Sequence, residues 1–500
     1  MDTQMTDGEI NQSGSHLISI PLEVLLQITS SLTTPEYGNL RRTCKTIEAS
    51  LFSSFSREFF TKRQFMVTEF SLQALVDISK SRYSTSLKHV IFGLERPILP
   101  NFRLLSHVGN GSNRPVLRNR LVQEYVSYLG LVNTGEDVEM LAEAFSNLAS
   151  LETIGVRDFY SRSRNRDYPR VEWKSYGVST YETETGSQLE RIRQDLGAGS
   201  SEPLEQYISR IFINLFRALG KASSRPKSFE VILRQSSLHD HAFYLRKNTD
   251  SLIQPVLANL HTLFLDLNSQ FLPVYVDGDS QPLQCPSYLL RQFLSKLPQL
   301  QHLRLNFHAY ERFLCNNFLS WLAKPVSTIA PTSGAYLQAP PPVDLLNLQQ
   351  LDIGMTSIEP DILVALMRKY QATLCIISFH KVTLWQPNLD TSGENPNLWI
   401  KVFYQLSKLD LKLRAINMSF LFQQLSEEHR VQEITFKDSR QPQLRKWAGP
   451  DVQSGLRDFQ TFTTVVPIVV PILSDGDIAD SDADDSDASM NDSDGDSDED

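Results

Sequence analysis

The sequence predicts an α/β protein, and three observations lead to that class. A phrase of the form Leu-x-x-Leu-x-Leu, with aliphatic or aromatic substitutes, recurs along the chain, and its alternation is typical of a half-buried strand. Several copies follow an amphipathic helix, as at residues 288–297 and 360–370. The first sixty residues, in contrast, contain three short helical segments. The six phrases begin at residues 87, 151, 260, 300, 348 and 374.

Composition and charge restrict the function. Of the chain's 58 acidic residues, 13 lie within residues 475–500, which hold no Lys or Arg, so 45 acidic residues face 48 basic ones elsewhere. A body so close to neutrality predicts neither nucleic-acid nor membrane binding. The polar first residues do not resemble a secretory signal, and no apolar run reaches the roughly 18 residues that a membrane helix needs. We therefore expect an intracellular protein of the cytoplasm or nucleus.

Residues 18–60 are the most strongly patterned stretch. Pro21 can open the first helix, where its missing N–H costs nothing, and Thr34 can cap the second helix, with Pro35 at its first position. A unit of about forty residues buries too small a fraction of its surface to be self-sufficient, so part of its apolar surface should dock elsewhere. The apolar positions of the three helices are Val24, Leu25, Ile28, Leu32, Tyr37, Leu40, Cys44, Ile47, Leu51, Phe52, Phe55 and Phe59.

These residues resemble the F-box family. The match runs through Ile20-Pro21-Leu22-Glu23-Val24-Leu25-Leu26-Gln27-Ile28, then Leu32, then Leu40-Arg41-Arg42-Thr43-Cys44-Lys45. It departs from the family pattern at Ile20, where Leu is usual, and at Gly38. The resemblance implies docking on the Skp-type adaptor that links such proteins to a cullin scaffold; the alternative is an ordinary helical subdomain. The implied adaptor contacts are Ile20, Pro21, Leu22, Val24, Leu25, Ile28, Leu32, Leu40 and Cys44.

The recurring phrase resembles the strand segment of a leucine-rich repeat, in which alternate side chains point inward and a helix packs behind. The spacing runs from 26 residues to over 100, and the usual asparagine after the strand is absent. The resemblance therefore implies an irregular leucine-rich-repeat-like α/β solenoid that follows the three-helix F-box. The alternative is an unrelated α/β domain whose strands begin with leucine.

The expected organisation has four parts. Residues 1–16 and 474–500 are too polar to order themselves, 17–62 form the F-box, and 63–473 form the repeat-like domain. Loop insertions are expected at 157–200, with a short helix at 188–195, and at the Pro-rich stretch 324–343. A helix at 203–219 should end at Gly220. Late strands are expected at 409–413 and 431–436, and residues 465–473 are at best an edge strand because of Pro467 and Pro471.

Arginines and aromatic residues crowd the first insertion. Arginine forks recognise phosphate or carboxylate, so this segment can bind an acidic or phosphorylated substrate; the alternative is a solvated loop. The candidate substrate-binding residues are Arg157, Arg162, Arg164, Arg166 and Arg170. The acidic tail resembles a substrate of acidophilic kinases and can serve as a competing ligand for the same arginines. Its candidate phosphorylation sites are Ser481, Ser486, Ser493 and Ser497.

No pattern for catalysis is found. His239-Asp240-His241 has no third or fourth metal ligand nearby, and the four cysteines lie too far apart for a zinc site or a disulfide frame. Nucleotide-binding glycine loops and nucleophile motifs are absent from the sequence. We expect no metal, no cofactor and no enzymatic activity.

The two resemblances together imply a substrate-recognition subunit of a Skp/cullin/F-box ubiquitin ligase. The helices would bind the adaptor, and the repeats would hold a protein substrate. The alternative is a non-degradative interaction scaffold, in which the helices only cap the first apolar edge of the solenoid.

Overall fold

The structure is a computed structural model of the 500-residue chain. It describes residues 17, 20–97, 114–160, 166–167, 172–186, 189, 202–245, 247–268, 287–308, 312–326, 340–386, 396–426, 430–437 and 439–467.

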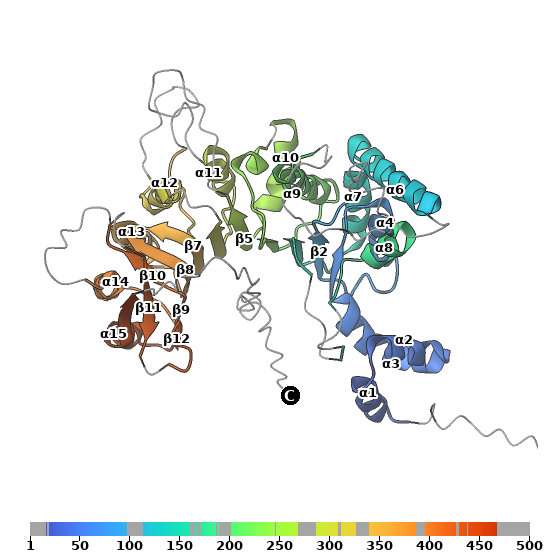
Figure 1. Cartoon of the computed structure of the whole chain (residues 1–500), viewed down its shortest axis with the longest axis horizontal. Coiled ribbons are helices and arrows are strands. Elements are labelled where there is room, and N and C mark those ends of the chain that lie inside the picture. Colours follow the sequence, from blue (N-terminus) through green and yellow to red (C-terminus); the bar gives the residue numbers. More distant parts are fainter. Residues whose placement is uncertain are drawn as a thin grey trace, which may run out of the picture.

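The α/β class is confirmed: the body is built on one open, mostly parallel 13-stranded sheet. From β1 to β8 each strand pairs in parallel with the next one along the chain, and β9 continues from the first half of β8. In Figure 1 these strands line the inner side of an arc. The parallel strands are β1 (Lys62–Phe65), β2 (His89–Gly93), β3 (Thr153–Arg157), β4 (Ser228–Ile232), β5 (Thr262–Leu267), β6 (His302–Phe307), β7 (Gln350–Ile358), β8 (Ile376–Trp385) and β9 (Ala415–Ser419).

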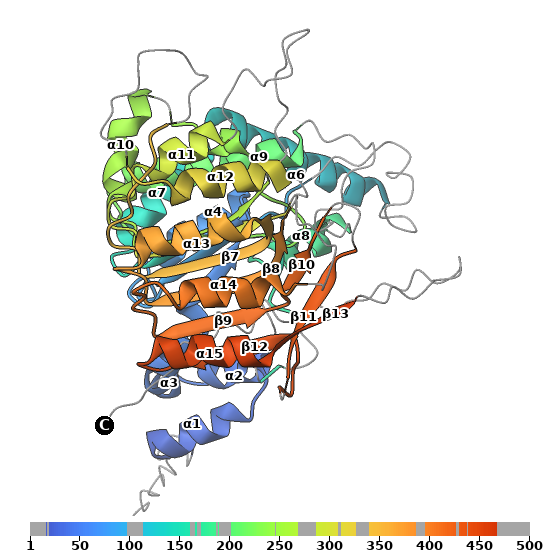
Figure 2. The same ribbon diagram turned by 90° about the vertical axis from the view of Figure 1, so that its left-hand side faces the viewer.

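Helices cover the outer side of the arc and pack side by side in chain order, as Figure 2 shows for α11 to α15. The first three helices, α1 (Leu22–Ser30), α2 (Thr34–Arg42) and α3 (Lys45–Phe60), stand apart at one end of the arc (Figure 1). The others are α4 (Glu69–Ser79), α6 (Arg114–Thr134), α7 (Glu136–Asn147), α8 (Val178–Thr185), α9 (Leu204–Lys221), α10 (Lys247–Leu257), α11 (Tyr288–Leu294), α12 (Arg312–Ala323), α13 (Pro360–Tyr370), α14 (Leu398–Leu406), α15 (Val452–Phe462) and the 3₁₀ helix η1 (Asp240–Phe243).

All six predicted phrases form strands in one common register. In each phrase the strand begins two residues after the first leucine, and the fourth and sixth side chains are buried against the helices. Leu303 and Leu305 of β6, for example, are 0 % exposed. The strands β1, β4 and β9 share this register but were not predicted, because Phe60 and Pro226 replace the first leucine of β1 and β4, and the β9 phrase begins at Leu413 rather than Leu409.

The last part of the sheet differs from the parallel strands β1–β9, hereafter the ladder. Beyond β8 the strands β10 (Phe422–Gln424), β11 (Gln432–Phe436), β12 (Leu444–Ala448) and β13 (Thr463–Pro467) pair mainly antiparallel. The prediction of a strand at 409–413 is wrong. Leu411 and Leu413 are buried, but they lie in the connection that leads into β9. The strands expected at 431–436 and around Val465 are present, and within the described residues β13 pairs only with β11.

Two predicted helix ends need correction. Gly220 does not end its helix, since α9 runs to Lys221. A Cβ at Gly220 would lie 2.7 Å from the carbonyl oxygen of Leu252, so the glycine is needed for close approach of α10. The N-cap of α2 is Thr33 rather than Thr34, and Thr33 forms a capping box with Glu36.

The secondary structure of the two insertions differs in part from the prediction. Helix α8 lies inside the first insertion and was missed, and the helix expected at 188–195 falls largely outside the described residues. The described ends of the Pro-rich stretch, 324–326 and 340–343, have no regular secondary structure, as expected. Within the described part of the chain, none of the helices combines the length and the apolar character required to span a bilayer.

Candidate binding surfaces

The N-terminal helices have a small core of their own. Leu25 of α1, Tyr37 of α2 and Leu51 and Phe59 of α3 are buried together, separately from the main core. Tyr37 contacts Phe55 edge-on at 5.5 Å between ring centroids. Each helix therefore contributes few residues to this core, which relies on aromatic contacts.

One side of α1 remains uncovered. Val24 and Ile28 are four residues apart and so share one side of the helix, and they expose 44 % and 39 % of their surface. Leu22, in the first turn, is 45 % exposed but lies on another side. The structure thus divides the predicted adaptor residues into two groups. Leu22, Val24, Ile28 and Pro21 are exposed, whereas Leu25 is buried within the helices, and Ile20, Leu32, Leu40 and Cys44 are half-buried around the same core.

Arg166 clamps the three helices together. Its guanidinium pairs with the carboxylate of Glu58 in α3 through two nitrogens, with Nη2–Oε2 at 2.6 Å. Its Nη1 donates to the carbonyl oxygen of Thr29, in the last turn of α1, at 2.8 Å and to that of Leu32, just after the helix, at 2.7 Å. The same group lies 4.8 Å from the ring centroid of Tyr37 in α2. The donors of Arg166 are thus used within the chain rather than presented to a substrate.

Asp167 and two aromatic residues dock the helices onto the body. Asp167 accepts the Thr34 N–H at 2.9 Å, which satisfies a free donor in the first turn of α2. Tyr83 stacks on Phe60 of α3 at 4.0 Å, and Trp173 contacts Phe59 at 6.0 Å. Sequence reasoning missed Asp167, Tyr83 and Trp173 as docking residues, because contacts more than twenty residues apart leave no periodic signal.

The other predicted substrate-binding arginines do not form a described cluster. Arg157 ends β3, is buried, and lies 5.4 Å from the ring of Phe159. Arg162, Arg164 and Arg170 lie outside the described residues. So do the candidate phosphorylation sites Ser481, Ser486, Ser493 and Ser497, together with the rest of the acidic tail.

The face of β1–β9 that is turned away from the helices, hereafter the open face, carries polar side chains. The second and fourth residues of each of β2–β9 belong to the main core, so the first, third and fifth point to the opposite side. In register across four strands, Glu230, Phe264, Arg304 and Asp352 form one row on this face. Phe264 is 5 % exposed yet is not part of the main core, as expected for a residue on the other side of the sheet.

Several cations act on the first half of the open face. The pKa of His89 lies well below its usual value, chiefly because burial disfavours the charged ring and also because Lys62 and Arg157 repel a proton. Burial raises the pKa of Glu230, and this effect is opposed by Arg157, Lys62, Arg304 and His302. In both cases burial is the larger cause of the shift, and the cations have a smaller effect.

Arg304 is the least engaged of these cations. Its guanidinium lies 5.7 Å from the ring centroid of Phe264, and among the described residues it has no hydrogen bond or ion pair. The acid opposite it in register, Asp352, is bound by His302 at 2.7 Å and by Gln350 at 3.2 Å. The His302 ring also contacts Phe264 edge-on at 4.7 Å. The guanidinium of Arg304 is thus half-buried and lies against the ring of Phe264.

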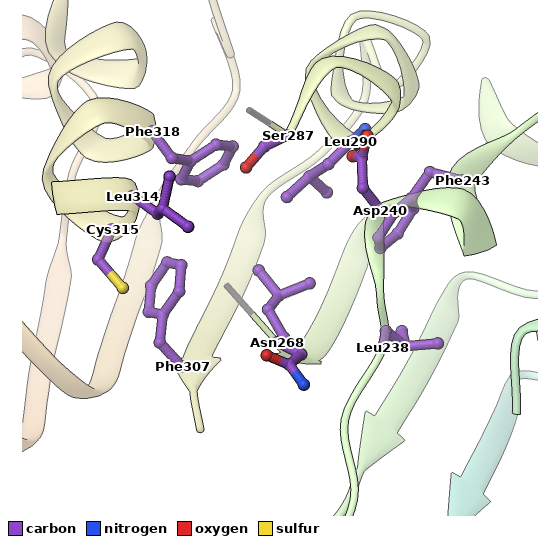
Figure 3. Close-up of a pocket in the computed structure, with 11 residues that line it drawn as sticks. Leu238, Asp240, Phe243, Asn268, Ser287, Leu290, Phe307, Leu314, Cys315 and Phe318 are labelled. Carbon is purple, nitrogen blue, oxygen red and sulfur yellow. Dashed lines mark hydrogen bonds between the residues drawn. The ribbon is translucent and has the colours of Figure 1, made fainter. Parts of the chain in front are cut away.

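A narrow cavity of about 10 Å³ lies between the helices and the sheet, beside η1, α11 and α12 (Figure 3). Its wall is mostly apolar, with Phe307 and Phe318 on one side, and it has room for about one water molecule. Asp240, beside it, accepts the N–H groups of Leu289 and Leu290 in the first turn of α11. This cavity is too small for an organic substrate.

The His239-Asp240-His241 segment is structural. His241 contacts the hydroxyl of Ser209 at 3.0 Å, and His239 contacts Asn268 at 3.2 Å. Among the described residues, no three His, Cys, Asp or Glu side chains are arranged to hold a metal ion.

Comparisons with known proteins add no family to this description. No family model matches the chain, and no curated protein matches it. Two surfaces of the chain itself bear on its function: the exposed side of α1 and the open face.

Proposed function

We propose that the protein is a non-catalytic substrate receptor of a Skp/cullin/F-box ubiquitin ligase. In this role the N-terminal helices bind a Skp-type adaptor, and the leucine-rich-repeat-like body holds a protein substrate. Reaction with ubiquitin then follows from the high effective concentration of the held substrate near the conjugating enzyme.

The observation that carries the proposal is the exposed side of α1. Exposed apolar residues scattered singly are ordinary, but Val24 and Ile28 share one side of a nine-residue helix that also carries the motif resemblance. Burying a side chain of this size is worth about 1.5–3 kcal/mol. A partner that covers both would therefore gain a substantial part of its binding free energy from α1 alone.

The solenoid part of the proposal is supported by the strand register. Nine parallel strands follow one another in chain order, and each buries its second and fourth side chains, except that Arg63 takes the second place in β1. Such an arrangement, with helices on one side only, leaves a long open face for a partner.

The test is binding of the full chain to a purified Skp-type adaptor, measured by calorimetry. We expect the double substitution Val24→Asp and Ile28→Asp to weaken binding at least tenfold, because it places charge in an apolar contact. Val126→Asp is the matched control, since Val126 of α6 is 58 % exposed and lies outside the proposed contact. Undiminished binding by the double variant, or no binding by the wild-type chain, would contradict the proposal.

A second candidate function is a non-degradative scaffold. The contacts of Tyr83, Trp173 and Arg166 with the N-terminal helices favour it, because they attach these helices to one end of the body. Affinity purification with and without proteasome inhibition separates the two functions. A scaffold would capture its partner without the adaptor and without a change in the partner's abundance.

A further inference from the structure

Thr34 and Pro35, at the start of α2, form the single Ser/Thr-Pro dipeptide of the 500-residue sequence. Of its 25 prolines, only Pro35 follows a serine or a threonine. Pro35 is exposed and Thr34 is half-buried, so the dipeptide lies at the surface, in the first turn of the helix. A threonine followed by proline is the minimal signal that proline-directed protein kinases require. The sequence therefore offers such a kinase one site, and this site lies where the N-terminal helices meet the body.

The Thr34 hydroxyl takes part in the attachment of α2. It donates a hydrogen bond to one carboxylate oxygen of Asp167, and the Thr34 N–H donates to the other at 2.9 Å. Arg166, next to Asp167 in the chain, binds Glu58 of α3 and two carbonyl oxygens at the end of α1. The contacts of Asp167 and Arg166 are therefore coupled, because adjacent residues of one backbone make them.

A phosphate on Thr34 is incompatible with this attachment. It carries a charge of about −1.5 to −2 at neutral pH, and it replaces the proton that the hydroxyl donates to Asp167. Phosphate and carboxylate then repel each other, and Glu36 adds negative charge in the same turn of α2. The adjacent guanidinium of Arg166 already donates from three nitrogens. Helix α2 itself tolerates the phosphate, because an anion is favourable in the first turn of a helix.

We propose that Thr34 is the acceptor site of a proline-directed protein kinase, and that its phosphate expels Asp167 and Arg166 from the N-terminal helices. In the transfer, Thr34 Oγ1 bonds to the γ-phosphorus of ATP, the bond from that phosphorus to the β–γ bridging oxygen breaks, and ADP leaves; the hydroxyl proton passes to a base of the kinase. The reaction takes place when the Asp167 contact opens, and the phosphate then prevents its closure. Helix α1 loosens most, because it loses Arg166, whereas Phe60 of α3 keeps its stacking on Tyr83.

The acceptor site is tested by incubating the full chain with ATP and a purified mitogen-activated protein kinase, followed by mass spectrometry of the intact chain and its fragments. We expect one phosphate, located on Thr34. Pro35→Ala is the matched control, because it keeps the acceptor hydroxyl and suits a helix but removes the kinase signal. Its initial rate should be at least tenfold lower. Absence of phosphate from Thr34, or an equal rate for Pro35→Ala, would overturn the proposed site.

The structural effect is tested by hydrogen exchange of the phosphorylated chain. We expect exchange in α1 and residues 29–32 to rise at least fivefold, with β5–β7 unchanged. In Asp167→Asn, which keeps an acceptor for the Thr34 N–H but has no charge to repel the phosphate, the rise on phosphorylation should be less than half as large.

Unchanged exchange in α1 of the phosphorylated wild type would contradict the proposal, and so would an equal rise in Asp167→Asn. Slower exchange would contradict it as well, because it would mean that Arg166 holds the phosphate. None of these measurements involves the Skp-type adaptor, so this inference and the proposed function fail separately.

Discussion

The N-terminal helices and the strand ladder achieve stability in different ways. In the ladder, nine strands and the helices behind them share one continuous core, with side chains such as Leu303 and Leu305 fully buried. The N-terminal helices bury only five large apolar residues of their own. They depend on Arg166 and Asp167, which belong to a distant segment. The ladder is self-sufficient, whereas the helices are held in place from outside and leave one side of α1 exposed.

The largest effect is expected from Leu305→Ala in β6. This change removes a fully buried side chain from the middle of the ladder and should cost about 3–5 kcal/mol of unfolding free energy. Hydrogen exchange should rise in the neighbouring strands β5 and β7 as well, because they share the core. Leu51→Ala in α3 is the comparison: exchange should rise in α1–α3 and stay unchanged in β5–β7. If both variants loosen the whole chain equally, the two regions are one unit.

The second-largest loss of stability is expected when the contacts of Arg166 with the N-terminal helices are removed. Arg166→Met keeps much of the side-chain volume but leaves the Glu58 carboxylate and two carbonyl oxygens without their donor, at a cost of about 2–4 kcal/mol. Hydrogen exchange in α1 and α3 should report the loss, with β5–β7 unaffected. Arg457→Met, which removes an exposed arginine 3.8 Å from Asp451, should change stability by less than about 0.5 kcal/mol. Unchanged exchange in α1 would contradict the assigned role of Arg166.

The ladder could be predicted from sequence far better than the docking of the helices. The phrase Leu-x-x-Leu-x-Leu located six strands in the correct register, because a period of two residues is set by local chain geometry. Where proline or phenylalanine replaced the first leucine, as in β4 and β1, the strand was missed. Arg166 was assigned to a substrate, and only the fold reveals that Glu58, Thr29 and Leu32 bind it. Long-range polar contacts of this kind follow from tertiary packing, not from any pattern within a window.

A smaller effect is expected from His89 of β2, next to the edge strand β1. Its pKa in the folded chain is well below the ordinary value of 6.5, so below that pH the unfolded chain binds a proton that the folded chain does not. The unfolding free energy should therefore fall with decreasing pH, by at most about 1.4 kcal/mol per pH unit from this group. Melting temperatures at pH 7.5, 6.5 and 5.5 should fall more steeply for wild type than for His89→Gln. Parallel curves would show that His89 is not the responsible group.

The smallest change in unfolding free energy is expected on the exposed side of α1. Val24→Ala removes two methyl groups from α1, but 44 % of this residue is already exposed and Ala has the higher helix propensity. Its unfolding free energy should change by less than about 0.5 kcal/mol, whereas a buried valine of the ladder, such as Val231→Ala, should lose about 1–3 kcal/mol. Thermal denaturation of the two variants measures the difference. A residue whose apolar side chain adds nothing to folding is free to serve binding, so a large loss for Val24→Ala would mean that this side of α1 is covered by the chain itself and is closed to a partner.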